Sequence, residues 1–203
     1  MFVIGITGGV ACGKSTVCRK LEERLPKERV SSFDSDAAVR ELMRRDDVLE
    51  AIKGMDEVSA ELFNEGSLLK DKLRKRVFDN SDFREKVESL LHPLVLDLAS
   101  QFCENNRILA KMVLMEIPLL YEVDFPLDID LEVVVAANRG TQLARLQNER
   151  CLDCELAEKV IASQLPIKEK IDRGDILVWN DGNEDALDEQ IRHLVTRCLP
   201  IFK

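Results

Sequence analysis

Long hydrophobic runs are missing from this 203-residue sequence. No stretch approaches the roughly 18 uninterrupted apolar residues that a membrane-spanning helix needs. The amino terminus runs directly into Phe2-Val3-Ile4, without the basic residues and cleavage site of a secretory leader. We therefore expect a cytoplasmic protein with no membrane partner.

An excess of positive charge is also absent. The chain has 29 Lys and Arg against 38 Asp and Glu, which gives a formal net charge of −9. A surface that neutralises nucleic-acid phosphates needs clustered cations. We therefore expect no nucleic-acid partner and infer that the partners are small molecules.

Cysteine and histidine are too few for a disulfide framework or an evident zinc site. Six cysteines in this length are sparse for a secreted scaffold, so we expect reduced thiols. Cys151 and Cys154 form one C-x-x-C, but a structural zinc ion needs four ligands, and the only histidines, His92 and His193, lie far away in sequence. We interpret the pair as incidental thiols, with a redox role as the open alternative.

Apolar residues make up 45% of the chain, enough for a packed core, and they fall into two periodicities. Short β-type runs alternate with segments of helical spacing, which predicts an α/β fold. Because parallel strands need crossover connections, we expect about five parallel strands flanked by helices. The predicted strands cover residues 2–7, 30–33, 112–115, 131–136 and 176–179, and a closing helix is predicted over 184–199.

Residues 46–107 interrupt this alternation with many charges and few β-type runs. The segment predicts a helical lobe, with its clearest helices over 68–78 and 83–102 and a bend or interruption of the second at Pro93. The core then comprises residues 1–45, 108–138 and 171–203.

A phosphate-binding motif follows the first predicted strand. Gly8-Gly9-Val10-Ala11-Cys12-Gly13-Lys14-Ser15 fits G-x-x-x-x-G-K-[ST], between a strand and a helix, and so predicts the P-loop NTPase fold. Its backbone N–H groups and the helix N-terminus attract phosphate. The predicted cofactors are ATP and Mg²⁺, with Lys14 at the β- and γ-phosphates, Ser15 as a metal ligand and Thr16 near the α-phosphate. The predicted ATP-binding residues are Gly9, Val10, Ala11, Cys12, Gly13, Lys14, Ser15 and Thr16.

The residues beyond the motif favour a small-molecule kinase. No N-K-x-D occurs to read guanine, and although Glu116 after the third strand resembles the water-orienting carboxylate of an ATPase, no coupling element is evident. Asp34-Ser35-Asp36 ends the second strand, which we expect next to the P-loop in the sheet. Either carboxylate could serve the acceptor or the metal, or simply cap the next helix.

Several landmarks together resemble the dephospho-CoA kinase family. Thr7 and the P-loop are followed by Asp34-Ser35-Asp36 with Arg40, and then, in the family's order, by these segments: Leu91-His92-Pro93-Leu94, Ile117-Pro118-Leu119-Leu120-Tyr121-Glu122, Gln142 to Arg150, Ser163-Gln164, Glu169-Lys170 and Asn180-Asp181-Gly182. The resemblance spans residues 2 to about 182. Five residues depart from the family's usual ones: Ala11 for Gly, Cys12 for Ser, Val39 for Ala, Glu116 for Asp and Gly174 for Ala.

The resemblance implies transfer of the ATP γ-phosphoryl group to the ribose 3′-hydroxyl of dephospho-CoA, with another small acceptor, such as a nucleoside monophosphate, as the alternative. This reaction needs a carboxylate to accept or orient the proton of the attacking hydroxyl. We assign this role to Asp36, with Asp34 holding metal-bound water or the acceptor and remaining the alternative base. The resemblance further implies that the acceptor is bound by Thr7, Asp34, Asp36, Arg40, His92, Pro118 and Leu119.

The resemblance also implies a lid over residues 139–170. Arg150 would reach the transferring phosphate and ATP on closure, with Arg145 as the competitor, and Asn180 would lie in the adenine-side loop. Cys12 in the P-loop is either a small residue that the loop tolerates or a thiol activated by the helix N-terminus.

Overall fold

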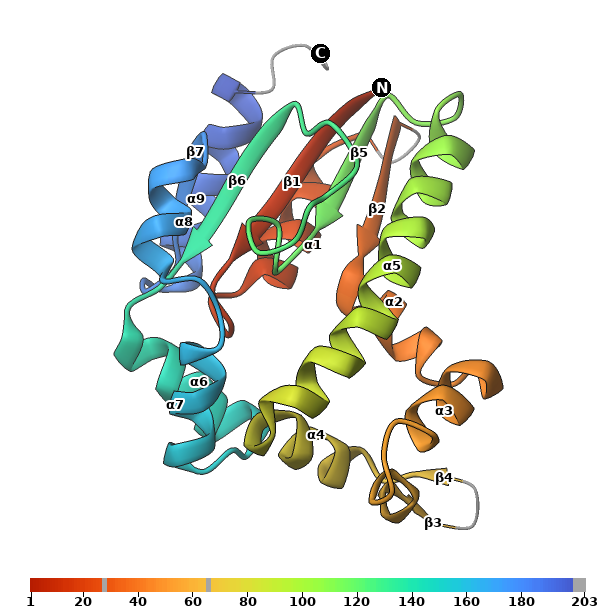
Figure 1. The fold of residues 1–203 in the computed structure, drawn as a ribbon. Helices are drawn as coiled ribbons and strands as arrows, with labels where there is room; N and C mark the ends of the chain where they lie inside the picture. The colour runs from red at the N-terminus through yellow and green to blue at the C-terminus, as the bar shows by residue number, and fades with distance from the viewer. Residues whose placement is uncertain (27–28, 65–66, 199–203) are drawn as a thin grey trace. The chain divides into compact units, whose positions relative to one another are not determined.

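Five parallel strands form the central sheet, in the order β2-β5-β1-β6-β7 (Figure 1). The computed structural model describes residues 1–26, 29–64 and 67–198. The strands are β1 (Phe2–Gly8), β2 (Val30–Asp34), β5 (Met112–Glu116), β6 (Leu131–Ala136) and β7 (Ile176–Trp179). The predicted fold class, a P-loop α/β sheet flanked by helices, is confirmed.

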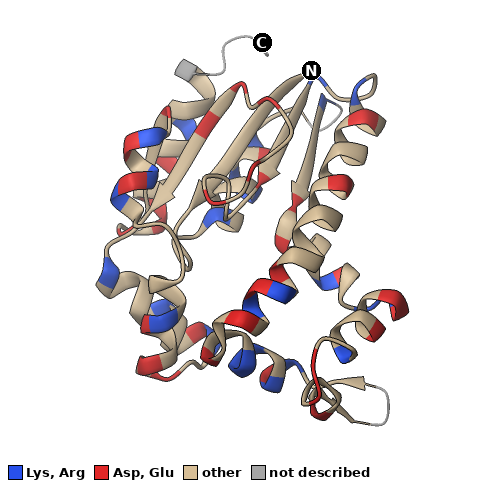
Figure 2. Ribbon diagram, in the orientation of Figure 1, with Lys and Arg blue, Asp and Glu red and all other residues tan. Residues whose placement is uncertain are grey.

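Apolar side chains explain why these runs form a sheet covered on both faces. All five residues of β5 are buried, as a strand between two helical layers requires. The five strands hold no Lys or Arg, whereas charged residues gather on the helices (Figure 2). The carboxylates that do occur include Asp34 and Glu116, which end β2 and β5 and lie in register with each other.

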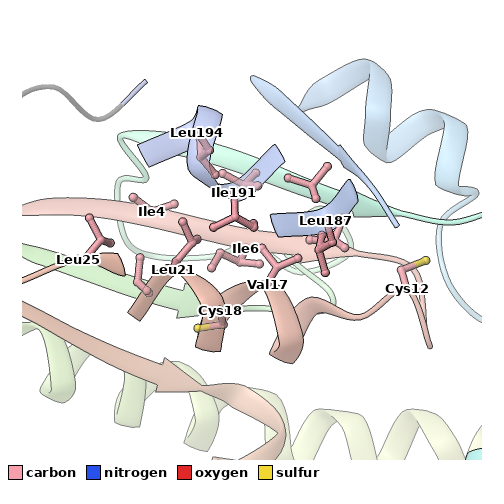
Figure 3. Packing of buried hydrophobic residues seen from close by; sticks show 14 of the residues in the cluster. Ile4, Ile6, Cys12, Val17, Cys18, Leu21, Leu25, Leu187, Ile191 and Leu194 are labelled. Carbon is pink, nitrogen blue, oxygen red and sulfur yellow. The ribbon is translucent and has the colours of Figure 1, made fainter. Parts of the chain in front are cut away.

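The face of the sheet toward α1 (Lys14–Arg24) and α9 (Glu184–His193) holds the main apolar cluster (Figure 3). Ile4 and Ile6 of β1 contribute fully buried side chains to this cluster, together with Leu21 of α1 and Ile191 of α9. Leu114 of β5 also belongs to this cluster. Successive strand residues point to opposite faces, so the next residue, Met115, lies on the other face of the sheet. There its sulfur lies 3.9 Å from the Cys103 sulfur of α5 (Ser81–Asn106).

Three helices connect β6 to β7. They are α6 (Arg139–Arg150), α7 (Cys154–Ala162) and α8 (Ile167–Arg173). Asn138 caps α6 by accepting a hydrogen bond from the Thr141 N–H, and Asp153 caps α7 in the same way at Leu156. No helix of the described ranges has the length and hydropathy to span a membrane.

Residues 36–99 form a second compact unit, distinct from the unit made of residues 1–35 and the chain from residue 100 onward. Its helices are α2 (Ser35–Leu42), α3 (Asp46–Lys53), α4 (Lys70–Asp79) and most of α5. Its own core surrounds Phe83, which is 1% exposed, and includes Leu42, Ile52 and Leu91.

The predicted start of the first helix of this unit was wrong. Strands β3 (Phe63–Asn64) and β4 (Ser67–Leu68) pair in a short antiparallel hairpin, so residue 68 lies in a strand and not in a helix. Two-residue strands leave no periodicity to read. The second helix was predicted to be interrupted or bent at Pro93; helix α5 runs through Pro93 without an interruption. Proline removes one N–H donor, and apolar packing before and after it, at Leu91 and Leu94, continues along the helix.

The carboxyl-terminal helix differs in form. Helix α9 ends at His193 and is followed by a π-helical turn over Leu194–Cys198. Leu199, where the sequence predicts the end of this helix, lies outside the described residues, as does the side chain of Cys198.

Gly174, at the end of α8, is required by its close packing. A Cβ atom there would lie 2.3 Å from Cγ2 of Val134 on β6, although the backbone angles of Gly174 suit any residue. We predict that Gly174→Ala destabilises the protein by about 1–3 kcal/mol, as overpacking does. Urea unfolding measures the change.

Gly54 offers a matched control, because a Cβ there would meet only ordinary contacts at 3.5 Å or more. Gly54→Ala should leave stability unchanged or raise it slightly. Equal unfolding midpoints for the Gly174→Ala variant and the parent protein would refute the packing argument.

Candidate functional site

The P-loop connects β1 to α1 and depends on glycines where the chain turns. Gly8 and Gly13 have φ angles of 141° and 91°. A Cβ at Gly8 would lie 2.0 Å from the Val135 carbonyl oxygen, and one at Gly13 would lie 2.3 Å from Nδ2 of Asn180. Both positions therefore need glycine for the backbone angle and for the space.

The Lys14 ammonium lies against this loop. Lys14 opens α1 and is 8% exposed, and its Nζ donates to the carbonyl oxygens of Gly8 at 3.3 Å and Gly9 at 2.9 Å. These contacts hold the cation at the loop whose N–H groups the motif predicts to bind phosphate.

Ser15 and Glu116 form the next contact of the site. The Ser15 hydroxyl donates to Glu116 Oε1 at 2.7 Å, and Glu116 is 4% exposed. Because Asp34 is in register with Glu116 on the neighbouring strand, three oxygen-bearing side chains share the carboxyl edge of the sheet. The expectation that the Asp34 strand adjoins the P-loop strand was wrong, since β5 lies between β2 and β1.

Side chains from outside the loop hold its backbone. Gln142 Nε2 of α6 donates to the Val10 carbonyl oxygen at 2.8 Å, and the Val10 N–H donates to Gln164 Oε1 at 2.8 Å. Arg145 donates through Nη1 to the Ala11 carbonyl oxygen at 3.0 Å, and Asn180 Nδ2 donates to that of Cys12 at 2.9 Å. We call these four side chains the outer brace.

The outer brace also joins the predicted adenine-side loop to α6. Arg145 Nη2 donates to the Asn180 carbonyl oxygen at 2.8 Å. Asp181 accepts from the Asn138 backbone N–H at 3.0 Å and from its side-chain amide at 2.7 Å. Desolvation raises the pKa of Asp181, but hydrogen bonds from Asn138, Thr141 and Trp179 outweigh this and leave the pKa lowered.

Cys12 belongs to the core and not to the phosphate side of the loop. Its side chain is fully buried in the cluster with Val17 and Leu187 (Figure 3). Burial raises its pKa, although Lys14 opposes the shift. Burial and the nearby charges of Glu22, Glu116 and Asp34 likewise raise the pKa of Cys18 to about 12. The structure therefore favours the packing interpretation of Cys12 over an activated thiol.

The other predicted site residues lie in both units. In the first, Thr7 is buried and its hydroxyl donates to the Pro118 carbonyl oxygen at 3.4 Å; Leu119 follows, and Arg150 ends α6 in an exposed position. In the second, Asp36 lies in the first turn of α2, Arg40 in its last turn, and half-buried His92 lies on α5.

Residues that the sequence did not assign to the site take prominent places in it. The sequence indicates Glu116 as a carboxylate that resembles the water-orienting group of an ATPase and stands where the family often has Asp, with its metal role left open, and it indicates Gln142 and Gln164 only as family landmarks. Arg145 is the alternative to Arg150 for contact with the transferring phosphate. In the structure its guanidinium donates instead to the carbonyl oxygens of Ala11 and Asn180. Gln142 and Arg145 lie one helical turn apart and so share one face of α6. Two polar residues with this spacing are the sequence pattern that indicates a helix face in contact with polar groups, here the P-loop backbone.

Thiol labelling tests the burial of the P-loop cysteine. We predict that, among the five cysteines whose side chains the structure describes, iodoacetamide modifies the native protein only at the exposed pair Cys151 and Cys154, because the other three thiols are buried with raised pKa values. Mass spectrometry of peptides from the native and the urea-unfolded protein reads the modified sites.

The labelling uses a Cys198→Ser background, because the side chain of Cys198 lies outside the described residues. Unfolding must expose the three protected sites, Cys12, Cys18 and Cys103, to labelling. Labelling of native Cys12 as fast as that of Cys151 would contradict its assignment to the core.

Comparison with known proteins agrees with this geometry. The family model of dephospho-CoA kinase matches residues 2–186. A dephospho-CoA kinase of Fusobacterium nucleatum is 30% identical over 192 residues, with 94% of this chain and 95% of the relative covered. One from Nostoc sp. is 34% identical over 190 residues, with 93% and 94% covered. A Thermus thermophilus crystal structure has a TM-score of 0.73 and 26% identity, with 96% of each chain covered.

These matches extend over nearly the whole chain and include the segment from the P-loop to the residue after β7, where the outer brace lies. The resemblance predicted from the motifs is confirmed: this chain belongs to the dephospho-CoA kinase family.

Proposed function

We propose that this protein transfers the γ-phosphoryl group of ATP to the ribose 3′-hydroxyl of dephospho-CoA, giving CoA and ADP. The observation that carries the proposal is the Ser15–Glu116 contact of 2.7 Å beside Asp34, at the edge of the sheet where the P-loop begins. A phosphate loop and carboxylates at one edge are what phosphoryl transfer requires. The acceptor follows from family membership.

ATP binds through the loop from Gly9 to Gly13 and the first turn of α1. Because the outer brace satisfies the carbonyl oxygens of Val10, Ala11 and Cys12 from outside, these peptide groups are fixed before the nucleotide arrives. Lys14 supplies the mobile charge for the β- and γ-phosphates, and Thr16 supplies a hydroxyl near the α-phosphate. Asn180 borders the adenine through the loop after β7.

Mg²⁺ fits the donors at the carboxyl edge of β5 and β2. Ser15 and Asp34 offer hard oxygen ligands, and Glu116 holds the Ser15 hydroxyl. Within the described residues, no three His, Cys, Asp or Glu side chains gather as a complete metal site. That agrees with Mg²⁺, which is usually held by one or two protein oxygens, water and substrate phosphates. The ion would neutralise charge on the β- and γ-phosphates.

Asp36 is the base in this proposal. The 3′-oxygen forms a bond to the γ-phosphorus as the bond to the β,γ-bridging oxygen breaks; the hydroxyl proton passes to Asp36, and the electron pair leaves with ADP. The transition state is loose, so orientation and charge neutralisation supply most of the rate. Arg40, His92, Thr7, Pro118 and Leu119 bind the acceptor.

Arg150 is the arginine that reaches the transferring phosphate. Arg145 is engaged with two carbonyl oxygens of the P-loop region, and the Arg139 guanidinium pairs with Glu158. Arg150 occupies the exposed end of α6, next to the turn into α7. Its delivery on lid closure adds positive charge only when the acceptor is present.

An acceptor panel tests the activity. The protein is incubated with Mg-ATP and dephospho-CoA, adenosine 5′-monophosphate, deoxyadenosine or shikimate. We expect CoA as the product, identified by ³¹P NMR as a ribose 3′-phosphate. Turnover of another panel member at a higher kcat/KM, or none with dephospho-CoA, would overturn the proposal.

The base assignment has its own prediction. Asp36→Asn should lower kcat by at least about 10²-fold, the lower range for a lost general base, with the ATP dissociation constant unchanged. Glu41→Gln is the matched control, because Glu41 lies on the same helix in an exposed pair with Arg44 that contributes little. Near-normal turnover of the Asp36 variant would move the base to Asp34.

A further inference from the structure

A buried lysine outside the phosphate loop lies at the centre of a small polar network. The side chain of Lys170, on α8, is 0% exposed. Its Nζ donates to the Pro118 carbonyl oxygen at 2.7 Å and pairs with Glu122 Oε1 at 2.7 Å. Glu122 Oε1 also accepts from the Leu165 N–H at 3.0 Å.

The segment that Lys170 contacts begins where β5 ends. Ile117 follows Glu116 directly, and its N–H donates to the Ile6 carbonyl oxygen of β1 at 2.9 Å. Ligands of open parallel sheets bind beyond the carboxyl ends of the strands. Because β5 lies between β1 and β2, the residues that follow it border the edge that carries the P-loop and Asp34.

Successive hydrogen bonds join this segment to the P-loop in a closed ring. The Val10 N–H bonds to Gln164, and the next residue, Leu165, bonds to Glu122. Glu122 pairs with Lys170, which bonds to the Pro118 carbonyl oxygen, and the same oxygen accepts from the hydroxyl of Thr7, just before the P-loop. The ring therefore starts in the P-loop at Val10 and returns to the end of β1 at Thr7.

A contribution to stability does not by itself explain why the Lys170–Glu122 ion pair is buried. Burial lowers the pKa of Lys170, which shows that the ammonium loses hydration that Glu122 only partly replaces. Buried ion pairs are often no more stabilising than apolar residues of similar size. Lys170 does, however, fix one backbone carbonyl oxygen, that of Pro118, and no apolar residue can do this.

We propose that Lys170 is a positioning residue: through its hydrogen bond to the Pro118 carbonyl oxygen, it sets the Ile117–Glu122 segment against the end of β1 so that this segment presents the acceptor to the P-loop. The proposal rests on the proposed function. The direct bond to Pro118, more than the charge of Glu122, determines acceptor use.

Two variants separate positioning from charge pairing. Lys170→Met removes the donor to Pro118, whereas Glu122→Gln keeps an oxygen for Leu165 and Lys170 but removes the charge. Lys170→Met should lower kcat/KM for dephospho-CoA by about tenfold or more, the effect of one lost charged hydrogen bond. Glu122→Gln should lower it much less, and both variants should keep the wild-type ATP dissociation constant.

A double variant guards against misfolding. Lys170→Met with Glu122→Gln leaves no unpaired buried charge, so its melting temperature should recover relative to Lys170→Met, while kcat/KM for dephospho-CoA stays low. Lys168→Met, an exposed lysine on the same helix, is the matched control and should behave as wild type.

Hydrogen exchange provides a readout independent of turnover. The backbone amides of Ile117 and of residues 119–123 should exchange faster in Lys170→Met and in the double variant, with those of residues 9–13 unchanged. Equal acceptor kinetics in Lys170→Met and wild type, or recovery of kcat/KM with stability in the double variant, would overturn the positioning role. Absence of wild-type turnover with dephospho-CoA would instead overturn the proposed function. The hydrogen-exchange rates would still test whether Lys170 orders the Ile117–Glu122 segment.

Discussion

The register of three parallel strands is the constraint on which the site depends. Pairing of β1 with β5, and of β5 with β2, aligns the ends of all three strands at one edge. That alignment brings the Ser15 hydroxyl to Glu116 and sets Asp34 beside Glu116. A shift of one residue would turn these side chains to the opposite face of the sheet, because side chains alternate along a strand. The apolar cluster of Ile4, Ile6 and their neighbours opposes such a shift.

Around this edge, polar side chains act mainly on backbone atoms. The outer brace bonds to four backbone groups of the P-loop, and Lys170 bonds to one backbone group after β5, the Pro118 carbonyl oxygen. Ordering these groups in the folded protein means that less conformational freedom is lost when phosphate binds. The brace also holds Ala11 at a φ of 56°, a left-handed angle that costs a non-glycine residue about 1–2 kcal/mol. This explains how the chain tolerates alanine where the family usually has glycine.

Close packing accounts for two further departures, Cys12 and Gly174. Cys12 fills a space in the apolar cluster that a hydroxyl would occupy less favourably. Gly174 leaves room for Val134, and the neighbouring Tyr121 hydroxyl donates to Glu132 at 2.6 Å. Burial, followed by the hydrogen bond to Glu132, raises the pKa of Tyr121. These departures thus belong to the support of the site, and the residues Gly13, Lys14 and Ser15 are unchanged from the motif.

The sequence by itself determined the five strands, the P-loop and the family, because apolar periodicity and a contiguous glycine motif are local signals. It did not determine strand order, and so β2 was expected next to β1. Nor did it assign Glu116, Gln164 or Lys170 to the site, since their partners lie 101, 154 and 52 residues away in the chain. Only the tertiary structure decided those contacts, because hydrogen bonds between distant residues depend on how the strands cross over and pack, and no local pattern records that.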